Sequence, residues 1–202
     1  MDRTSHWNRA YGSKKPNEVS WFQSSPDESM GYIRRLSDRS ARIVDVGGGA
    51  SVLVDALLDA GYSRPVVLDV SATGLEYART RLGQRAPLVD WVVGDVTKAP
   101  TVPEVDLWHD RAVLHFLTEL ADQQAYARLA AKTVRHAGYA VIATFAPDGP
   151  ERCSGLPVQR HDGASIARLL GPDFELLDEE RNVHRAPSGA EQRFCWSLLR
   201  RS

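Results

Sequence analysis

Cysteine is scarce in this sequence of 202 residues, which contains only Cys153 and Cys195. Two cysteines cannot form a disulfide framework or a four-thiolate metal site. No two histidines have the spacing of metal ligands, so we predict no metal. Long hydrophobic runs are lacking as well, because the longest, from Tyr139 to Ala146, is far below the ~20 residues that span a bilayer. These absences exclude a disulfide-rich module and argue against a membrane-spanning helix.

Neither sign of charge dominates. Lys and Arg total 25, Asp and Glu total 26, and the formal net charge is −1. A chain with this balance has no overall attraction to nucleic acid or to an anionic membrane surface, so we expect neither as a partner. The opening residues MDRTSHWNRAYGS contain no apolar segment of a secretory signal. We therefore expect a cytoplasmic protein of one domain, with its oligomeric state open and a monomer compatible with its size.

The sequence does contain a regular alternation of short apolar runs and helical stretches. Runs typical of strands occupy 41–46, 65–69, 90–93, 105–109 and 139–145. The intervening segments predict helices over 52–60, 72–82 and 119–134, with Ser51, Ser71 and Thr118 as N-caps and with Gly61 and Gly83 ending the first two. Strands that alternate with helices indicate a parallel sheet covered on both faces.

The pattern changes after residue 145. Residues 146–162 are loop-like, and 163–170 predict a short helix. The last two apolar runs, 174–181 and 193–199, predict an antiparallel pair at the edge of the sheet. Residues 1–40 are expected to form a cover over one end of the sheet, ahead of a single domain over 41–202.

A glycine-rich turn joins the first strand to its helix. Gly47, Gly48 and Gly49 would let the backbone turn sharply and let a ligand approach closely. Asp45, two residues earlier, would repel a pyrophosphate by ~4 kcal/mol for unit charges 4 Å apart at an effective dielectric near 20. A dinucleotide fingerprint also requires a third glycine where Val52 stands. The turn therefore favours a ligand with a cationic or amino group over a dinucleotide.

Two further carboxylates end the next two strands. Asp69 ends the second strand, about 20 residues beyond the glycines, at the position that hydrogen-bonds ribose hydroxyls. Asp95 follows the third strand, where a carboxylate can accept a hydrogen bond from an exocyclic adenine amine. Each alone could be a solvated turn aspartate. Together with Asp45 they predict a ligand site, because open α/β sheets bind ligands at the carboxyl ends of their strands.

At these residues the sequence resembles the class I S-adenosylmethionine-dependent methyltransferases, from about residue 41 to 145. Residues 45–49 match that family's first motif, with Ser51 where a third glycine often stands. The resemblance implies S-adenosylmethionine as cofactor and an α/β fold: a Rossmann-like doubly wound sheet of seven strands, mostly parallel with an antiparallel last strand, and helices on both faces. It also implies a cofactor site in which Asp45 and the glycines face the methionine part, Asp69 with its neighbour Val70 binds the ribose, and Asp95 with Val96 holds the adenine.

The end of the fourth strand holds the candidate catalytic groups, because it lies beside the first strand at the switch point. We expect Asp110 near the methionine part of the cofactor, and Arg111 as its partner or as a clamp on a substrate anion. His109 could be a base, although alternation along the strand could turn it away. His115 lies in the apolar run AVLHFL, so a packed histidine and a catalytic one are both open.

Aromatic residues cluster near the start of the chain. Trp7 and Tyr11 lie four residues apart, on one face if the segment is helical, and Trp21 and Phe22 follow. They could form a helix packed on the sheet. Alternatively they form a lid, with Tyr11 and Trp21 contacting the cofactor and attracting its sulfonium through cation–π contact.

The segment from Pro147 to Pro157 follows the fifth strand at the same sheet end, so it is the expected specificity element. Arg152 and Cys153 could line the acceptor pocket, with Arg160 and His161 just beyond. The alternative is an ordinary surface loop in which Cys153 is an inert small hydrophobe.

The leading hypothesis is a methyltransferase that transfers a methyl group to a small-molecule acceptor by in-line displacement. The alternative is a protein lysine methyltransferase, with Trp7, Tyr11, Trp21 and Trp108 as walls of a lysine channel. A non-catalytic nucleotide-binding module is a third possibility. A nicotinamide-dependent oxidoreductase is disfavoured by Asp45 and Val52, and a nucleic-acid methyltransferase by the near-zero net charge.

Overall fold

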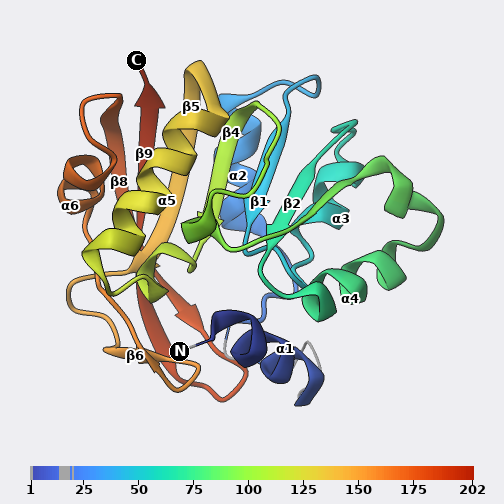
Figure 1. The fold of residues 1–202 in the computed structure, drawn as a ribbon, viewed down its shortest axis with the longest axis horizontal. Helices are drawn as coiled ribbons and strands as arrows, with labels where there is room; N and C mark the ends of the chain where they lie inside the picture. Colours follow the sequence, from blue (N-terminus) through green and yellow to red (C-terminus); the bar gives the residue numbers. More distant parts are fainter. Residues whose placement is uncertain (1, 14–18, 20) are drawn as a thin grey trace.

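A seven-stranded sheet runs through the middle of the molecule (Figure 1). The computed structural model describes residues 2–13, 19 and 21–202. In spatial order the strands are β3 (Asp90–Val93), β2 (Val66–Asp69), β1 (Ile43–Val46), β4 (Val105–Arg111), β5 (Val134–Phe145), β9 (Glu191–Arg201) and β8 (Phe174–Arg185). The first five pair in parallel, and β9 is antiparallel to both β5 and β8. The predicted Rossmann-like α/β sheet, with its last strand antiparallel, is confirmed.

Helices cover both faces of the sheet (Figure 1). One apolar cluster joins α2 (Asp27–Leu36) and α3 (Leu53–Asp59) to the sheet, and a smaller one joins α3 and α4 (Ala72–Leu82) to β2. A third cluster joins the opposite face to α5 (Leu120–Thr133) and α6 (Gly163–Leu170). The central strands β1 and β2 are therefore buried at every residue, as their continuous apolar sequences predict, whereas the edge strand β3 is only partly buried.

Alternation along β4 decides which layer each side chain meets. Leu107 packs in the cluster with α2 and α3, whereas Trp108 packs in the cluster with α5. Trp108 is fully buried, and its Nε1 donates a hydrogen bond to Tyr126 Oη of α5 (2.8 Å). Adjacent residues of this strand therefore serve opposite faces of the sheet, and this continues into His109 and Asp110.

The predicted helix starts need correction at two of three places. Ser71 caps α4 as predicted, accepting from the Gly74 N–H (3.0 Å), and Gly83 ends that helix. However, α3 begins at Leu53, with Val52 at its N-cap and Ser51 accepting from the Leu53 N–H (3.1 Å). The helix predicted from Thr118 begins at Leu120, with Glu119 at an N-cap that has no side-chain hydrogen bond. Both helices begin one residue later than predicted, which lies within the usual variation of helix ends.

Strands are more extensive than the apolar runs indicated. β5 starts directly after α5, at Val134 rather than at Tyr139. β8 continues to Arg185 rather than ending at residue 181, and β9 already begins at Glu191 rather than at residue 193. The segment 146–162 is not simply a loop, because β6 (Arg152–Cys153) and β7 (Leu156–Pro157) form a small hairpin within it. These added segments are short or mix polar, exposed residues with isolated buried ones such as Val134 and Cys153, so hydrophobic patterning gave no clear signal for them.

The expected cover over residues 1–40 consists of two different elements. α1 (Arg3–Ser13) lies against the carboxyl ends of the parallel strands, at the end of the sheet where the β6 hairpin also lies (Figure 1). α2 instead packs on a sheet face as part of the core. Part of the predicted aromatic lid, at residues 1, 14–18 and 20, is outside the described residues. The division between a cover and a domain at residue 40 stays a prediction.

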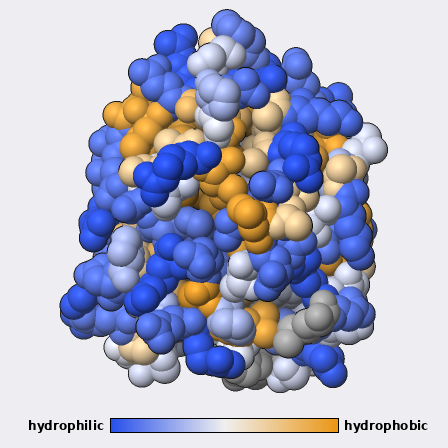
Figure 2. All heavy atoms as spheres, turned by 60° about the vertical axis from the view of Figure 1, so that its left-hand side comes forward, coloured by the Kyte–Doolittle hydropathy of each residue, from blue (hydrophilic) through white to orange (hydrophobic). Residues whose placement is uncertain are grey.

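Hydrophilic side chains dominate the side that carries α5, α6 and β8, with small apolar areas between them (Figure 2). Within the described chain, no helix combines the length and apolar character needed to cross a bilayer. Among the same residues, no group of three or more His, Cys, Asp or Glu side chains could hold a metal ion. The concave features that concern function lie elsewhere, at the strand ends beneath α1.

Candidate functional site

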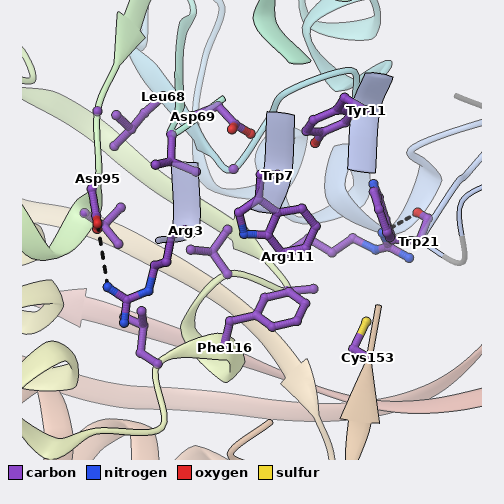
Figure 3. Close-up of a pocket in the computed structure, with 17 residues that line it drawn as sticks. Arg3, Trp7, Tyr11, Trp21, Leu68, Asp69, Asp95, Arg111, Phe116 and Cys153 are labelled. Carbon is purple, nitrogen blue, oxygen red and sulfur yellow. Dashed lines mark hydrogen bonds and ion pairs between the residues drawn. The ribbon is translucent and has the colours of Figure 1, made fainter. Parts of the chain in front are cut away.

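Two adjoining cavities lie at the carboxyl ends of β1, β2 and β4 and share Tyr11, Trp21, Gly47 and Arg111. The first (Figure 3) also extends along the ends of β2 and β3 and is lined by Arg3, Trp7, Leu68, Asp69, Val70, Gly94, Asp95, Val96, Ala112, Val113, Phe116, Leu117 and Cys153. The second reaches α2 and includes Ser29, Asp45, Ala50, Ser51 and His109. The first cavity is partly open to solvent.

The glycine turn has no space for side chains. Gly47 has a φ of +69° and lines both cavities, and a Cβ there would clash with the side chain of Val113. A Cβ on Gly48 would lie 2.6 Å from Asp45 Oδ2. At Gly49, where φ is +31°, it would clash with the Tyr11 hydroxyl. The turn therefore presents bare backbone between the two cavities, as a close ligand approach requires.

Asp69 ends β2 with a buried carboxylate in the wall of the first cavity (Figure 3). Its Oδ1 accepts a hydrogen bond from the Ser71 N–H (2.7 Å). Burial raises the pKa of Asp69 to about 7, with the nearby charge of Asp45 adding to the effect. A ligand that donates hydrogen bonds would stabilise the ionised carboxylate, so the position suits hydroxyl groups.

Asp95 also lines the first cavity, but the structure gives it protein partners. Oδ1 accepts from the Thr97 N–H (2.9 Å) and hydroxyl (2.8 Å), and Oδ2 pairs with Arg3 Nη1 of α1 at 3.6 Å (Figure 3). Arg3 also pairs with Asp122 at the start of α5. Sequence reasoning missed Arg3, because its position follows from how α1 docks rather than from any local motif.

A hydrogen-bonded chain runs from β1 through β4 to α2. Asp45 and His109 are register partners on adjacent strands, and Asp45 Oδ1 lies 2.9 Å from His109 Nδ1. His109 Nε2 lies 2.9 Å from Ser29 Oγ, and all three side chains are buried. Asp45 Oδ2 is buried and has no partner among the described residues. His109 therefore orients Asp45 and has no free ring nitrogen with which to act as a base.

Asp110 points to the opposite face of the sheet and lines neither cavity. Oδ1 accepts from the Val113 N–H (2.7 Å), and Oδ2 accepts from the Leu114 N–H (3.1 Å) and the Tyr126 hydroxyl (2.7 Å). Burial raises the pKa of Asp110 to about 6, and these hydrogen bonds oppose the rise. This geometry gives no support to the expected contact between Asp110 and the methionine part, which stays a prediction. Asp110 instead fixes the turn whose residues Ala112 and Val113 line the first cavity.

His115 follows on a one-turn 3₁₀ helix (Leu114–Phe116) and is fully buried. Its ring packs against Phe116 and Phe145, with centroid separations of 4.4 and 4.7 Å. Burial lowers the pKa of His115 to about 3, so the ring is neutral near pH 7. It lines neither cavity, so of the two alternatives the packed histidine agrees with the geometry.

Arg111 reaches both cavities from the end of β4 (Figure 3). Nη1 donates to the Trp21 carbonyl (3.0 Å), and the guanidinium lies over the Phe194 ring at 5.2 Å from its centroid. The expected pairing with Asp110 is wrong, because Asp110 is occupied by the turn and by Tyr126. Nη2 is buried without a hydrogen-bond partner among the described residues.

α1 closes the first cavity with aromatic side chains. Trp7 contacts Phe116 and Trp21 edge to face, with centroids 5.0 and 5.5 Å apart, and Tyr11 lies 6.2 Å from Trp21. Asn8 holds the helix in place by accepting from the Ser71 hydroxyl (2.7 Å) at the start of α4. α1 is thus a packed helix and also a wall of the cavity. The two alternatives for this segment, a packed helix and a lid in which Tyr11 and Trp21 face the ligand, do not exclude each other.

Only Cys153, among the residues expected from the 147–161 segment, reaches a cavity; it is buried in the wall of the first (Figure 3). The Arg152 side chain donates to the Gly155 carbonyl (2.5 Å), and that of Arg160 to the Gly149 carbonyl (3.2 Å). His161 is buried beside Ser165. The hairpin therefore contributes one side chain to the site, and its arginines brace the loop.

The family comparison matches residues 43–138 to a family described as a methyltransferase domain. The span covers β1 through the beginning of β5, and therefore the glycine turn and all three strand-end carboxylates. Residues 43–138 of this chain therefore form a methyltransferase domain. S-adenosylmethionine is the cofactor expected for this domain. The comparison with curated proteins finds no match.

Solved structures share this methyltransferase's fold at low sequence identity. An S-adenosylmethionine-dependent methyltransferase from Anabaena variabilis has a TM-score of 0.79 and 14% identity over 100% of this chain and 96% of that one. The N-methyltransferase NodS from Bradyrhizobium japonicum, in complex with S-adenosylhomocysteine, has a TM-score of 0.68 and 14% identity over 96% and 97%. The Burkholderia thailandensis 1,6-didemethyltoxoflavin-N1-methyltransferase has a TM-score of 0.68 and 18% identity over 98% and 84%.

Three features of the methyltransferase site fit this cofactor. Gly47 leaves bare backbone between the cavities, where a Cβ would clash with Val113. Asp45 Oδ2 is a buried acceptor with no partner among the described residues, suited to the amino group of a methionine chain. Asp69 is a buried carboxylate suited to a pair of hydroxyl groups. S-adenosylmethionine has an amino group at one end and ribose hydroxyls farther along. The residues present fit it, because an acceptor for the amino group lies in the second cavity and one for the hydroxyls in the first.

Proposed function

We propose that this enzyme transfers a methyl group to a small-molecule acceptor by in-line displacement. The observation that carries the proposal is the meeting of the two cavities at Gly47 and Arg111, under a roof formed by α1. The bound cofactor supplies a methyl group already activated on a sulfonium. The protein then needs chiefly to align an acceptor with that methyl, and alignment can account for roughly 7–11 kcal/mol of a barrier.

The proposed cofactor site uses both cavities. Asp45, whose Oδ1 is held by His109, would accept hydrogen bonds from the methionine amino group at Oδ2 in the second cavity. Asp69 accepts from the ribose hydroxyls in the first, with Val70 beside it. The adenine lies farther along the first cavity against Val96, with Asp95 at its edge. The glycine turn lies between these regions and allows the ligand to cross from one to the other.

The proposed acceptor site is the part of the first cavity bounded by Trp7, Trp21, Phe116 and Cys153. These side chains come from α1, the segment after it, the turn after β4 and the β6 hairpin. α1 is docked by Asn8 and Arg3, so the space beneath it accommodates a small molecule better than a folded protein surface. Aromatic faces there would also attract the sulfonium by cation–π contact.

Proton transfer is a minor part of the proposed mechanism. His109 has both ring nitrogens in hydrogen bonds, and His115 is packed between Phe116 and Phe145. Asp110 has both oxygens occupied by the turn and by Tyr126. The proposal therefore favours an acceptor that reaches the site already deprotonated, or one that releases its proton after transfer.

The protein lysine methyltransferase alternative loses one expected channel wall. Trp108 is fully buried in the core beside Tyr126, on the α5 face of the sheet, and lines neither cavity. The remaining aromatic residues, Trp7, Tyr11 and Trp21, lie at the boundary between α1 and the cavity. They serve a small acceptor equally well.

Calorimetry and turnover together test the proposal. The wild-type enzyme should bind S-adenosylhomocysteine and should not bind nicotinamide dinucleotides. It should also release S-adenosylhomocysteine from S-adenosylmethionine when a suitable member of a panel of small thiols, amines and carboxylic acids is present. Turnover that occurs only with folded proteins, with the product mass shift on a lysine, would contradict the small-acceptor assignment. Failure to bind S-adenosylhomocysteine would contradict the cofactor site itself.

A further inference from the structure

Among the described residues, no carboxylate directly contacts the positively charged side chain of Arg111, whose Nη2 atom is buried. Twelve arginines of the described chain lie within 4.0 Å of a carboxylate oxygen, and Arg111 is not among them: they are Arg3, Arg35, Arg42, Arg64, Arg79, Arg81, Arg85, Arg135, Arg160, Arg181, Arg185 and Arg193. A buried charge without a partner is costly, so its presence in a cavity wall indicates a ligand.

The groups around Arg111 leave it charged and leave one of its nitrogens unused. Burial lowers the pKa of Arg111 to about 10, and the nearby charges of Glu28 and Asp45 oppose that effect, so the side chain is protonated near pH 7. Asp45 directs its Oδ1 to His109 rather than to the guanidinium. Nη1 donates to the Trp21 carbonyl, which fixes the plane of the guanidinium, whereas Nη2 has no hydrogen-bond partner within the part of the chain that the structure describes.

The surroundings of Arg111 select for the shape of a ligand as well as for its charge. The ring of Phe194 supports the guanidinium at 5.2 Å, and Trp7, Trp21 and Phe116 form the neighbouring apolar wall (Figure 3). A planar guanidinium that is held in one orientation recognises a carboxylate better than a flexible ammonium does. The cavity therefore offers one anion-binding group beside an aromatic surface.

We propose that the acceptor is a small organic acid whose carboxylate binds Arg111 while its apolar part packs against Trp7, Trp21 and Phe116. The inference rests on the proposed function and specifies its substrate class. The carboxylate of the cofactor's own methionine part offers the same chemistry to this arginine. The acceptor is favoured because Arg111 lies over Phe194 and beside Trp21 and Cys153, on the α1 and hairpin side of the cavity, away from Asp69.

The experiment uses the full-length enzyme and measures two affinities. Calorimetry gives the affinity for S-adenosylhomocysteine in the wild type, Arg111→Gln, Arg111→Lys and Arg193→Gln. Ligand-observed NMR then measures binding of benzoate, phenylacetate and butyrate, each against its uncharged amide, to enzyme saturated with S-adenosylhomocysteine. Arg193 is the control because it lies next to Phe194 but is exposed and pairs with Asp148 at 3.0 Å.

The wild type should bind at least one carboxylate more tightly than its amide. Arg111→Gln should lose about tenfold or more of that carboxylate affinity, Arg111→Lys should retain part of it, and Arg193→Gln should match the wild type. The affinity for S-adenosylhomocysteine should stay within about twofold in all four proteins. Equal binding of acids and amides, or no carboxylate binding at millimolar concentration, would overturn the proposal.

Two other results are distinguishable. If Arg111→Gln weakens S-adenosylhomocysteine and leaves the carboxylates unaffected, Arg111 serves the cofactor and the proposed acceptor class is wrong. If the wild type does not bind S-adenosylhomocysteine at all, the proposed function fails before the acceptor is examined.

Discussion

The two halves of the proposed site are built in different ways. The proposed cofactor half consists of backbone and carboxylates at the ends of adjacent parallel strands, at Gly47, Asp45 and Asp69. The proposed acceptor half consists of side chains from a helix, a turn and a hairpin far apart in the sequence, such as Trp7, Phe116 and Cys153. The first half is fixed by the sheet, so its geometry follows from the fold. The second is fixed by how separate segments dock, so it is free to differ between enzymes of one fold.

The largest expected effect is in the cofactor half, at the glycine turn. Gly47→Val should abolish binding of S-adenosylhomocysteine, because the new side chain would clash with Val113 at a positive φ and obstruct the passage between the cavities. Calorimetry measures the loss, and circular dichroism verifies that the variant is folded. Gly31→Ala is the control, since a Cβ there contacts nothing within 4 Å. A folded Gly47→Val protein with unchanged affinity would remove this turn from the cofactor site.

Asp69 should show the next largest effect and a dependence on pH. Asp69→Asn should lose about 1.5–3 kcal/mol of S-adenosylhomocysteine binding, the usual value for hydrogen bonds to a charged group. The folded pKa of about 7 lies above the ordinary 3.8, so the native state binds more protons between these values. The free energy of unfolding of the ligand-free enzyme should therefore fall as pH rises from 3.8 to about 7.

Urea unfolding at several pH values in this range measures that slope, and Asp69→Asn should flatten it. Ribose hydroxyls donate to the ionised carboxylate, so the wild-type affinity for S-adenosylhomocysteine should rise as pH passes through about 7. A pH-independent affinity in the wild type would contradict the assignment of Asp69.

Replacing Asp110 tests whether this side chain supports the cavity wall or contacts the ligand. Asp110→Asn should lower the free energy of unfolding by about 1–2 kcal/mol, because one of its acceptor atoms becomes a donor facing other donors. Binding of S-adenosylhomocysteine should weaken less, since Asp110 reaches the ligand only through Ala112 and Val113. Thermal or urea unfolding and calorimetry give the two values. Full stability combined with a complete loss of binding would instead support direct contact.

The smallest expected effect concerns the far end of the hydrogen-bonded chain. Ser29→Ala removes the partner of His109 Nε2, and His109 in turn orients Asp45. The affinity for S-adenosylhomocysteine should fall by about 0.5–1.5 kcal/mol, the typical net value of one hydrogen bond. Ser25→Ala is the matched control. Ser25 is exposed, and its hydroxyl donates a hydrogen bond to Asp27, the first residue of α2. Equal affinities for the two variants would show that Asp45 needs no support from α2.

The positions of the three strand-end carboxylates could be predicted from the sequence because the signals are local. A glycine turn after a strand, with acidic residues at successive strand ends, places Asp45, Asp69 and Asp95 at one edge of a parallel sheet without knowledge of the rest. The antiparallel final pair was also visible, as two apolar runs with a polar connection. These features depend on the order of elements along the chain, and the sequence contains that order.

The roles of His109 and Asp110 could not be predicted in the same way. Both stand at the end of one strand, and the register with β1 decides that His109 meets Asp45 while Asp110 turns toward Tyr126. Both oxygens of Asp110 accept hydrogen bonds from the turn and from Tyr126, so Asp110 does not pair with Nη2 of Arg111. Arg3 and Asn8 were missed because their partners are set only when α1 docks. Such contacts are tertiary, and no spacing along the chain encodes them.

Ionic strength should affect the rate at which ligands enter the first cavity. Arg3 fastens the first turn of α1 to Asp95 at the end of β3 and to Asp122 on α5, across the cavity that α1 covers. These side chains are partly exposed, so dissolved salt weakens their attraction. The association rate of S-adenosylhomocysteine should therefore increase with salt concentration. At most charged sites the association rate instead falls as salt is added, because salt screens the attraction between protein and ligand. Here it would screen ion pairs within the protein.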